Sequence, residues 1–126
     1  MIISQFDKLC NWIKHVNDTD VLMGEGTSFM GHYVNRIVIH HNYNLEKNGL
    51  IALLHECGHA LQPKTPTGVN KYKLYEVRSD KFKKGLYENE VDAWKRARDI
   101  AVDLHLNLDW VAFNREESAS IKTYKY

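Results

Sequence analysis

Residues 45–61 read LEKNGLIALLHECGHAL, and Gln62-Pro63 follows directly. Apolar residues recur here at three- and four-residue steps, which is the period of an α-helix, and proline cannot continue one. We therefore predict a helix over Leu45–Leu61. At about 100° per residue, its apolar side carries Leu50, Leu53, Leu54, Cys57, Ala60 and Leu61, and its other side carries Ala52, His55, Glu56 and His59. One side suits packing and the other can present ligands.

The segment His55-Glu56-Cys57-Gly58-His59 contains a His-Glu-x-x-His pattern. Residues four apart lie one helical turn on, so both imidazoles project from one face at a spacing that can close on a single Zn²⁺. Glu56 stands about 100° round the helix from His55, beside the metal, where it can act as general base toward a metal-activated water. The alternative is a pair of surface or core histidines. The intervening glutamate and the apolar back of the helix favour the metal site.

A catalytic zinc site needs a third protein ligand and an open position. No histidine occurs between Ala60 and Thr65, so this ligand must come from another element. A second long amphipathic helix is predicted over Tyr87–Leu106, and its glutamates Glu88 and Glu90 are the candidates.

The helical wheel separates the two glutamates. Glu90 falls at the centre of the apolar face, near Trp94, whereas Glu88 lies about 160° away on the solvated side. A carboxylate on a packing face is costly unless a cation meets it, which favours Glu90 as the ligand. A salt bridge from Glu90 to arginine or lysine is one alternative. Glu88 as ligand, in a helix that begins later, is another. Ala93 leaves room where the two helices would cross.

The remaining chain predicts an α+β domain of helices packed on a small β-sheet. The other expected elements are a helix over Ser4–Val16, a turn over Asn17–Asp20, strands over Ser28–Val34 and Arg36–His41 that form a hairpin near Asn35, an edge strand over Lys71–Val77 and a short helix over Asp109–Ser118. The tail after Ala119 is expected to fray.

The chain has 126 residues, which suits one domain over residues 1–126. Its net charge of +1 excludes a globally basic nucleic-acid coat, and its seven histidines are unusual for this length. No apolar run approaches a membrane span, and no secretory leader is expected. With only two cysteines, Cys10 and Cys57, we expect a cytoplasmic protein, in which Cys57 is a buried hydrophobe.

The two motifs together resemble the gluzincin-type zinc metallopeptidases. The run from Arg36-Ile37-Val38-Ile39 through His55–His59 to Glu90-Val91-Asp92-Ala93-Trp94 is similar to the minimal zincin domains of the ImmA/IrrE type. The similarity covers roughly Gly31 to Ala101. It implies zinc at His55, His59 and Glu90, Glu56 as general base, and helices packed on a small sheet.

The implied activity is peptide-bond hydrolysis with a peptide or protein substrate. Either predicted strand, Ser28–Val34 or Arg36–His41, is a candidate edge for an extended substrate. One of His40 and His41 is a further candidate for the metal site. Candidates by residue type for stabilising the oxyanion are His32, Tyr72, Tyr75, Arg78 and Tyr87.

Two other functions remain open. One is a non-catalytic binding module that keeps zinc as a structural pin, although such a module does not need Glu56. The other is a DNA-associated protease recruited through Lys71–Lys84, where six basic residues stand against two acidic ones. A solvated loop is the simpler interpretation of that segment.

Overall fold

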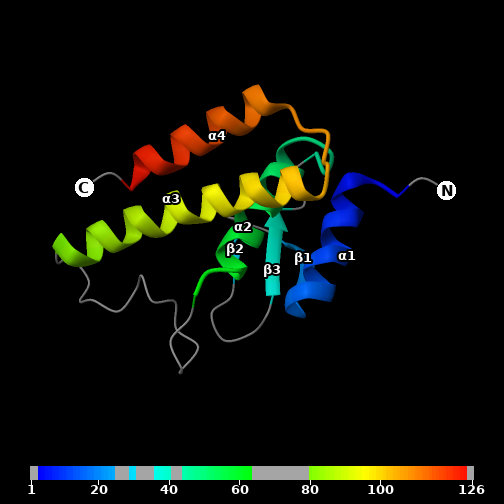
Figure 1. Ribbon diagram of the computed structural model, residues 1–126, viewed down its shortest axis with the longest axis horizontal. Helices are drawn as coiled ribbons and strands as arrows, with labels where there is room; N and C mark the ends of the chain where they lie inside the picture. The colour runs from blue at the N-terminus through cyan, green and yellow to red at the C-terminus, as the bar shows by residue number, and fades with distance from the viewer. Residues whose placement is uncertain (1–2, 25–28, 31–35, 41–43, 64–79, 125–126) are drawn as a thin grey trace.

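The computed structural model describes residues 3–24, 29–30, 36–40, 44–63 and 80–124 (Figure 1). These residues form four helices and a three-stranded sheet, so the predicted α+β class is confirmed. In chain order the elements are α1 (Gln5–Asn17), β1 (Asp20–Gly24), β2 (Phe29–Met30), β3 (Arg36–His40), α2 (Asn48–Ala60), α3 (Asp80–Asp103) and α4 (Trp110–Thr123). Among them, no helix combines the length and the apolar run needed to cross a bilayer.

Helix α1 forms close to its predicted position. The Ser4 hydroxyl accepts a hydrogen bond from the Asp7 N–H at 3.1 Å, which caps the first turn. The helix ends at Asn17 and is followed by Asp18, whose backbone is left-handed with φ of 49°. Its buried side carries Phe6, Leu9 and Ile13. Val16 was predicted on this side, but it is 47% exposed because it lies in the last turn, beyond the packed part of the helix.

The sheet has the strand order β1-β3-β2, with β1 parallel and β2 antiparallel to β3. Pairing of Phe29 with Val38 agrees with the predicted hairpin, whose turn lies outside the described residues. Strand β1 was not predicted, and it starts at Asp20, where the sequence indicated a turn. Because β3 is the central strand, it has no open edge, and the expectation that Arg36–His41 pairs with a substrate is wrong.

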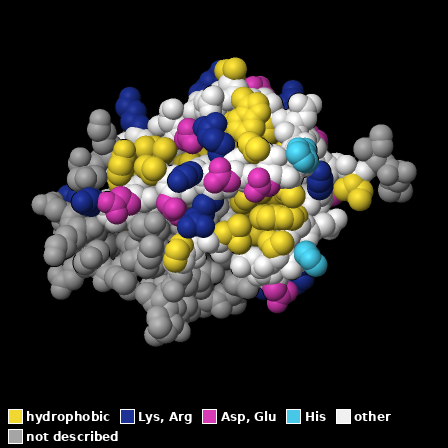
Figure 2. Space-filling view, in the orientation of Figure 1, with side chains coloured by type: hydrophobic (Ala, Val, Ile, Leu, Met, Phe, Trp, Pro, Cys, Tyr) yellow, Lys and Arg dark blue, Asp and Glu magenta, His cyan; other side chains and the backbone are white. Residues whose placement is uncertain are grey.

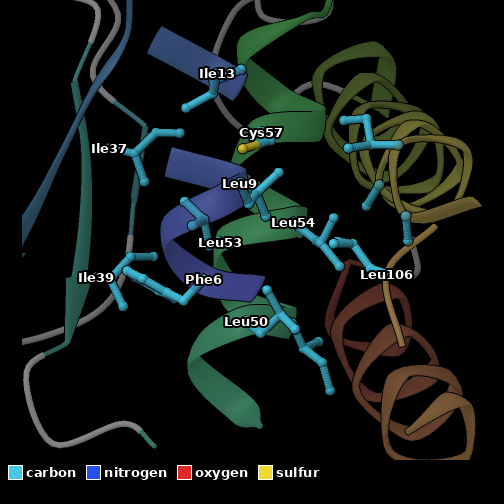
Figure 3. Packing of buried hydrophobic residues seen from close by; sticks show 14 of the residues in the cluster. Phe6, Leu9, Ile13, Ile37, Ile39, Leu50, Leu53, Leu54, Cys57 and Leu106 are labelled. Atoms are coloured by element: carbon cyan, nitrogen blue, oxygen red, sulfur yellow. The ribbon is translucent and has the colours of Figure 1, made fainter. Parts of the chain in front are cut away.

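The core is built around α2. Figure 3 shows Ile37 and Ile39 of β3 and the apolar side chains of α1 directed toward the leucines of α2. The residues predicted for the apolar side of α2 are buried, except that Leu61 is only partly so. Cys57 is fully buried, as predicted, and burial raises the pKa of its thiol well above the ordinary value. Helix α2 is therefore held from behind by α1 and the sheet.

Helix α2 begins at Asn48, not Leu45, because residues 45–47 form a turn. The Asn44 side chain accepts a hydrogen bond from the Glu46 N–H at 3.1 Å, and its carbonyl accepts from the Gly49 N–H at 2.9 Å. Asn44 thus closes a turn that precedes the helix, which is a common role for asparagine.

Helices α2 and α3 cross in direct backbone contact. A Cβ built on Gly58 would lie 2.1 Å from the carbonyl oxygen of Ala93, so only glycine permits this crossing. Ala93 is fully buried, in agreement with the room predicted at this position. On α2 the crossing is next to His59, and on α3 it is about one turn from Glu90. It therefore brings together the two helices that carry the predicted ligands.

The ends of α3 and α4 differ from the prediction. Helix α3 begins at Asp80, not Tyr87, and includes the buried Gly85. Packing has overridden the weak helix propensity of glycine there. Helix α4 continues to Thr123, beyond the predicted end at Ser118. The predicted edge strand over Lys71–Val77 lies outside the described residues.

Candidate metal centre

The two histidines of α2 lie side by side on the face opposite its apolar back. Their ring centroids are 4.7 Å apart, and the Nε2 atoms of His55 and His59 are 3.1 Å apart. This convergence is the direct consequence of the four-residue spacing on a helix. The pair is partly buried and sits where α3 crosses α2.

Glu90 of α3 meets both rings. Its Oε2 lies 2.8 Å from His55 Nε2, and its Oε1 lies 3.0 Å from His59 Nε2. Glu90 is 4% exposed, whereas the side chain of Glu88 is 50% exposed and lies 3.8 Å from Lys84. The glutamate that the helical wheel favoured is thus the one that lies beside both histidines. Among the described residues, Glu90 pairs with no lysine or arginine.

The spacing of these atoms suits a small divalent cation. His55, His59 and Glu90 each offer a ligand atom, and all three lie within 4.8 Å of one another. A tetrahedral zinc ion with bonds of about 2.0–2.1 Å holds its ligand atoms about 3.3 Å apart. The separations of 2.8 to 3.1 Å need to open by only a few tenths of an ångström. Two imidazoles and one carboxylate are also the donor types that zinc takes in catalytic sites.

The electrostatics of the three groups reflect their convergence. Burial raises the pKa of Glu90, but hydrogen bonds and charges from His55 and His59 outweigh it and leave the pKa below its ordinary value. Burial lowers the pKa of His59, but the hydrogen bond that its ring donates to Glu90 and the charge of Glu56 leave it raised. The cluster thus favours an ionised Glu90 carboxylate facing positive charge, which is the state that a cation would stabilise.

Glu56 lies next to the ligand cluster and is not a member of it. Its side chain is 7% exposed, and its Oε1 lies 3.5 Å from His55 Nδ1. The charge of Glu56 contributes to the raised pKa values of both His59 and Tyr124, so its carboxylate is close enough to act electrostatically on both groups. A buried carboxylate beside the three ligands is positioned to exchange protons with a molecule bound there.

Trp94 of α3 holds the ring of His55 in place. The two rings stack with centroids 4.4 Å apart and an interplanar angle of 8°. Phe113 packs edge-on against Trp94 at 5.3 Å. Trp94 was predicted to lie in the core, which it does, but the sequence did not indicate that it also supports a ligand. Its Nε1 is buried and has no hydrogen-bond partner among the described residues.

Helix α4 contributes two groups that the sequence did not identify. The Ser120 hydroxyl donates a hydrogen bond to Glu90 Oε2 at 3.2 Å. Tyr124 follows one turn later, and burial, together with the charges of Glu90 and Glu56, raises its pKa. Both residues fall in the tail that was expected to fray. The signal was present in the spacing, because Phe113, Ser120 and Tyr124 recur at helical steps.

The other candidates are placed as follows. Among the described residues, His40 at the end of β3 is not in the ligand cluster. Tyr87 lies on α3, one turn before Glu90. The remaining candidates for the oxyanion and the metal site, His32, His41, Tyr72, Tyr75 and Arg78, lie outside the described residues.

The basic segment Lys71–Lys84 is described only from Asp80 onward. On the face that carries α3 and α4, acidic and basic side chains are interspersed and do not gather by sign (Figure 2). The described residues of this face therefore form no continuous basic surface of the kind that binds nucleic acid.

Comparisons with known proteins add nothing to this picture. No protein-family model, curated protein or solved structure matches the chain.

Proposed function

We propose that this chain is a zinc-dependent metallopeptidase with a minimal zincin-like fold of the gluzincin, ImmA/IrrE-like type. The observation that carries the proposal is the convergence of His55 Nε2, His59 Nε2 and the buried Glu90 carboxylate, with Glu56 beside them. A zinc site with a purely structural role does not need that additional buried carboxylate. A metallopeptidase requires it as a base.

Zinc bound by His55, His59 and Glu90 would polarise a peptide carbonyl and lower the pKa of water. Glu56 accepts the proton of the attacking water and then passes it to the leaving amine. Trp94 and Ser120 keep His55 and Glu90 in place, through ring stacking and a hydrogen bond respectively. These supports reduce the reorganisation needed during the reaction.

Tyr124 is our candidate for the donor that stabilises the negative oxygen formed in the reaction. It lies one turn after Ser120, which contacts Glu90 directly, and the charges of Glu90 and Glu56 act on its hydroxyl. A protonated hydroxyl can donate a hydrogen bond to developing negative charge. For an extended substrate, β2 replaces β3 as the candidate edge, because β3 is paired on both sides.

The test compares three variants for zinc content and for cleavage of denatured proteins. Glu56→Gln should retain zinc and lose cleavage, because the ligands remain and the base is removed. His59→Ala should lose both. Glu88→Gln is the matched control, since Glu88 is exposed on the same helix as Glu90, and it should change neither.

Two outcomes would support the other functions. A wild-type protein that binds zinc tightly but leaves a broad peptide library intact would indicate a non-catalytic binding module. A salt-dependent DNA complex that is lost when Lys81, Lys83 and Lys84 are neutralised would indicate recruitment to DNA.

A further inference from the structure

Gln62 joins the helix of the two histidines to the helix of Glu90. Helix α2 ends at Ala60, and the Gln62 N–H donates to the carbonyl of His59 at 3.2 Å. Pro63 prevents the helix from continuing, so this turn carries the Gln62 side chain back beneath His59. Gln62 is 3% exposed, and a buried amide of this kind is stable only when it is hydrogen-bonded.

The partners of Gln62 determine which way its amide faces. Its Nε2 donates to the Asn89 carbonyl at 2.8 Å and to Asp92 Oδ2 at 3.0 Å. Asp92 is held in turn by the Nε of Arg96 at 2.8 Å. Both partners of Gln62 Nε2 are acceptors, so an amide turned over would place its oxygen against two other oxygens. Gln62 Oε1 is therefore fixed toward Nδ1 of His59, at 3.0 Å.

The orientation of this amide sets the proton on His59. Gln62 Oε1 can only accept a hydrogen bond, so His59 Nδ1 must carry the proton and donate. The neutral ring then has its lone pair on Nε2, which faces His55 Nε2 and Glu90 Oε1. Glu90 by itself favours the opposite tautomer, in which Nε2 carries the proton and donates to the carboxylate. Gln62 opposes that arrangement.

We propose that Gln62 is a positioning residue that selects the metal-binding tautomer of His59. The proposal rests on the metal centre proposed above. Gln62 Nε2 also donates a hydrogen bond to the carbonyl of Asn89, the residue directly before Glu90. A single buried side chain thus aligns ligands on α2 and α3 together. Partners of this kind, which orient metal-binding histidines, typically change metal affinity by about 10–100-fold when removed.

The experiment uses the full chain with Gln62→Leu, Gln62→Glu and the control Gln5→Leu. Gln5 is matched because its side chain also donates to a backbone carbonyl, that of Asn107, outside the ligand cluster. Zinc affinity is measured by competition with a chelator. The His59 tautomer is read from the ring ¹⁵N shifts of the zinc-free protein, at a pH where both imidazoles are neutral.

We expect zinc binding to weaken by about 10–100-fold in Gln62→Leu. The ring proton of His59 should move from Nδ1 to Nε2 in the same variant. Gln62→Glu keeps an acceptor for His59 and should retain the Nδ1 proton, but its second oxygen faces the Asn89 carbonyl and Asp92, so it should bind zinc more weakly than the wild type. Gln5→Leu should match the wild type in both measurements.

A wild-type protein with the His59 proton on Nε2 would overturn the inference, even if neither Gln62 variant folded. Equal zinc affinities in the wild type and Gln62→Leu would overturn it as well. Failure of the wild type to bind zinc would instead refute the metal centre. The ¹⁵N measurement would then still report whether Gln62 controls the tautomer.

Discussion

Replacing Gly58 by alanine should separate the two helices that carry the ligands. The added Cβ would lie 2.1 Å from the Ala93 carbonyl oxygen and 2.9 Å from the carbonyl carbon. A carbon and an oxygen need about 3.3 Å, so the helices must part by roughly 1 Å at the crossing. The obstructing atoms are backbone, and no side-chain rotation can relieve the overlap.

The expected size of the effect follows from two opposing contributions. Alanine is a better helix former than glycine by about 1 kcal/mol. Overpacking of a core costs about 1–3 kcal/mol, and a backbone obstruction belongs at the upper end of that range. We expect a net loss of about 2 kcal/mol in the free energy of unfolding. Zinc affinity should fall as well, because parting of the helices moves His59 on α2 away from Glu90 on α3.

The assay is urea unfolding of the zinc-free protein together with chelator competition for zinc. Gly49→Ala is the control, because it makes the same change in the same helix, where the nearest obstacle is 3.0 Å away and must yield by only a few tenths of an ångström. If Gly58→Ala proves as stable as Gly49→Ala and binds zinc like the wild type, the close crossing of α2 and α3 is refuted.

Three further results are expected. Glu90→Gln should weaken zinc binding more than about 100-fold, a larger loss than is typical for a residue that only hydrogen-bonds to a metal ligand. Glu88→Gln should leave the zinc dissociation constant unchanged, and equal effects of the two substitutions would refute the ligand assignment. Tyr124→Phe should lower kcat by about 100-fold or more at unchanged zinc content, and an unchanged kcat would exclude Tyr124 as the oxyanion donor. In the zinc-free protein, the raised pKa of His59 stabilises the fold fully below about pH 6.5, and this stabilisation is lost as pH rises through the folded-state pKa. The lowered pKa of Glu90 stabilises the fold above about pH 4.3, and this stabilisation is lost as pH falls through the folded-state pKa. Urea unfolding with chelator present should therefore show greatest stability between these two values, and a steady increase toward pH 9 would contradict this coupling.

The convergence of the three candidate ligands could be predicted because it depends on helical periodicity. The spacing of His55 and His59, and the place of Glu90 on an apolar face, are properties of single helices that the sequence records. The preference for Glu90 over Glu88 depends on the same property. The sequence left a salt bridge from Glu90 to lysine or arginine open, and among the described residues the structure shows none.

The supporting groups could not be predicted because they depend on how separate elements pack. Ser120 reaches Glu90 only because α4 continues and lies against the site, and Gln62 reaches Asn89 only because α2 crosses α3 at Gly58. The sequence around Gln62 indicated no more than the end of a helix. Packing of this kind leaves no periodic signal.

Strand β1 was missed for a related reason. Its residues Leu22 and Met23 are both exposed, so the alternation expected of a half-buried strand is absent. The strand exists through backbone pairing with β3, which begins opposite Asp20 at Arg36. Parallel pairing between distant segments is invisible to a local pattern.

The account depends most on zinc being held jointly by His55, His59 and Glu90. X-ray absorption at the zinc edge of the purified, zinc-loaded protein tests this directly. We predict stoichiometric zinc, with nitrogen and oxygen neighbours at about 2.0–2.1 Å that include two imidazoles, and loss of this signal in Glu90→Ala. A protein that takes up no zinc, or a Glu90→Ala variant whose spectrum matches the wild type, would contradict the account.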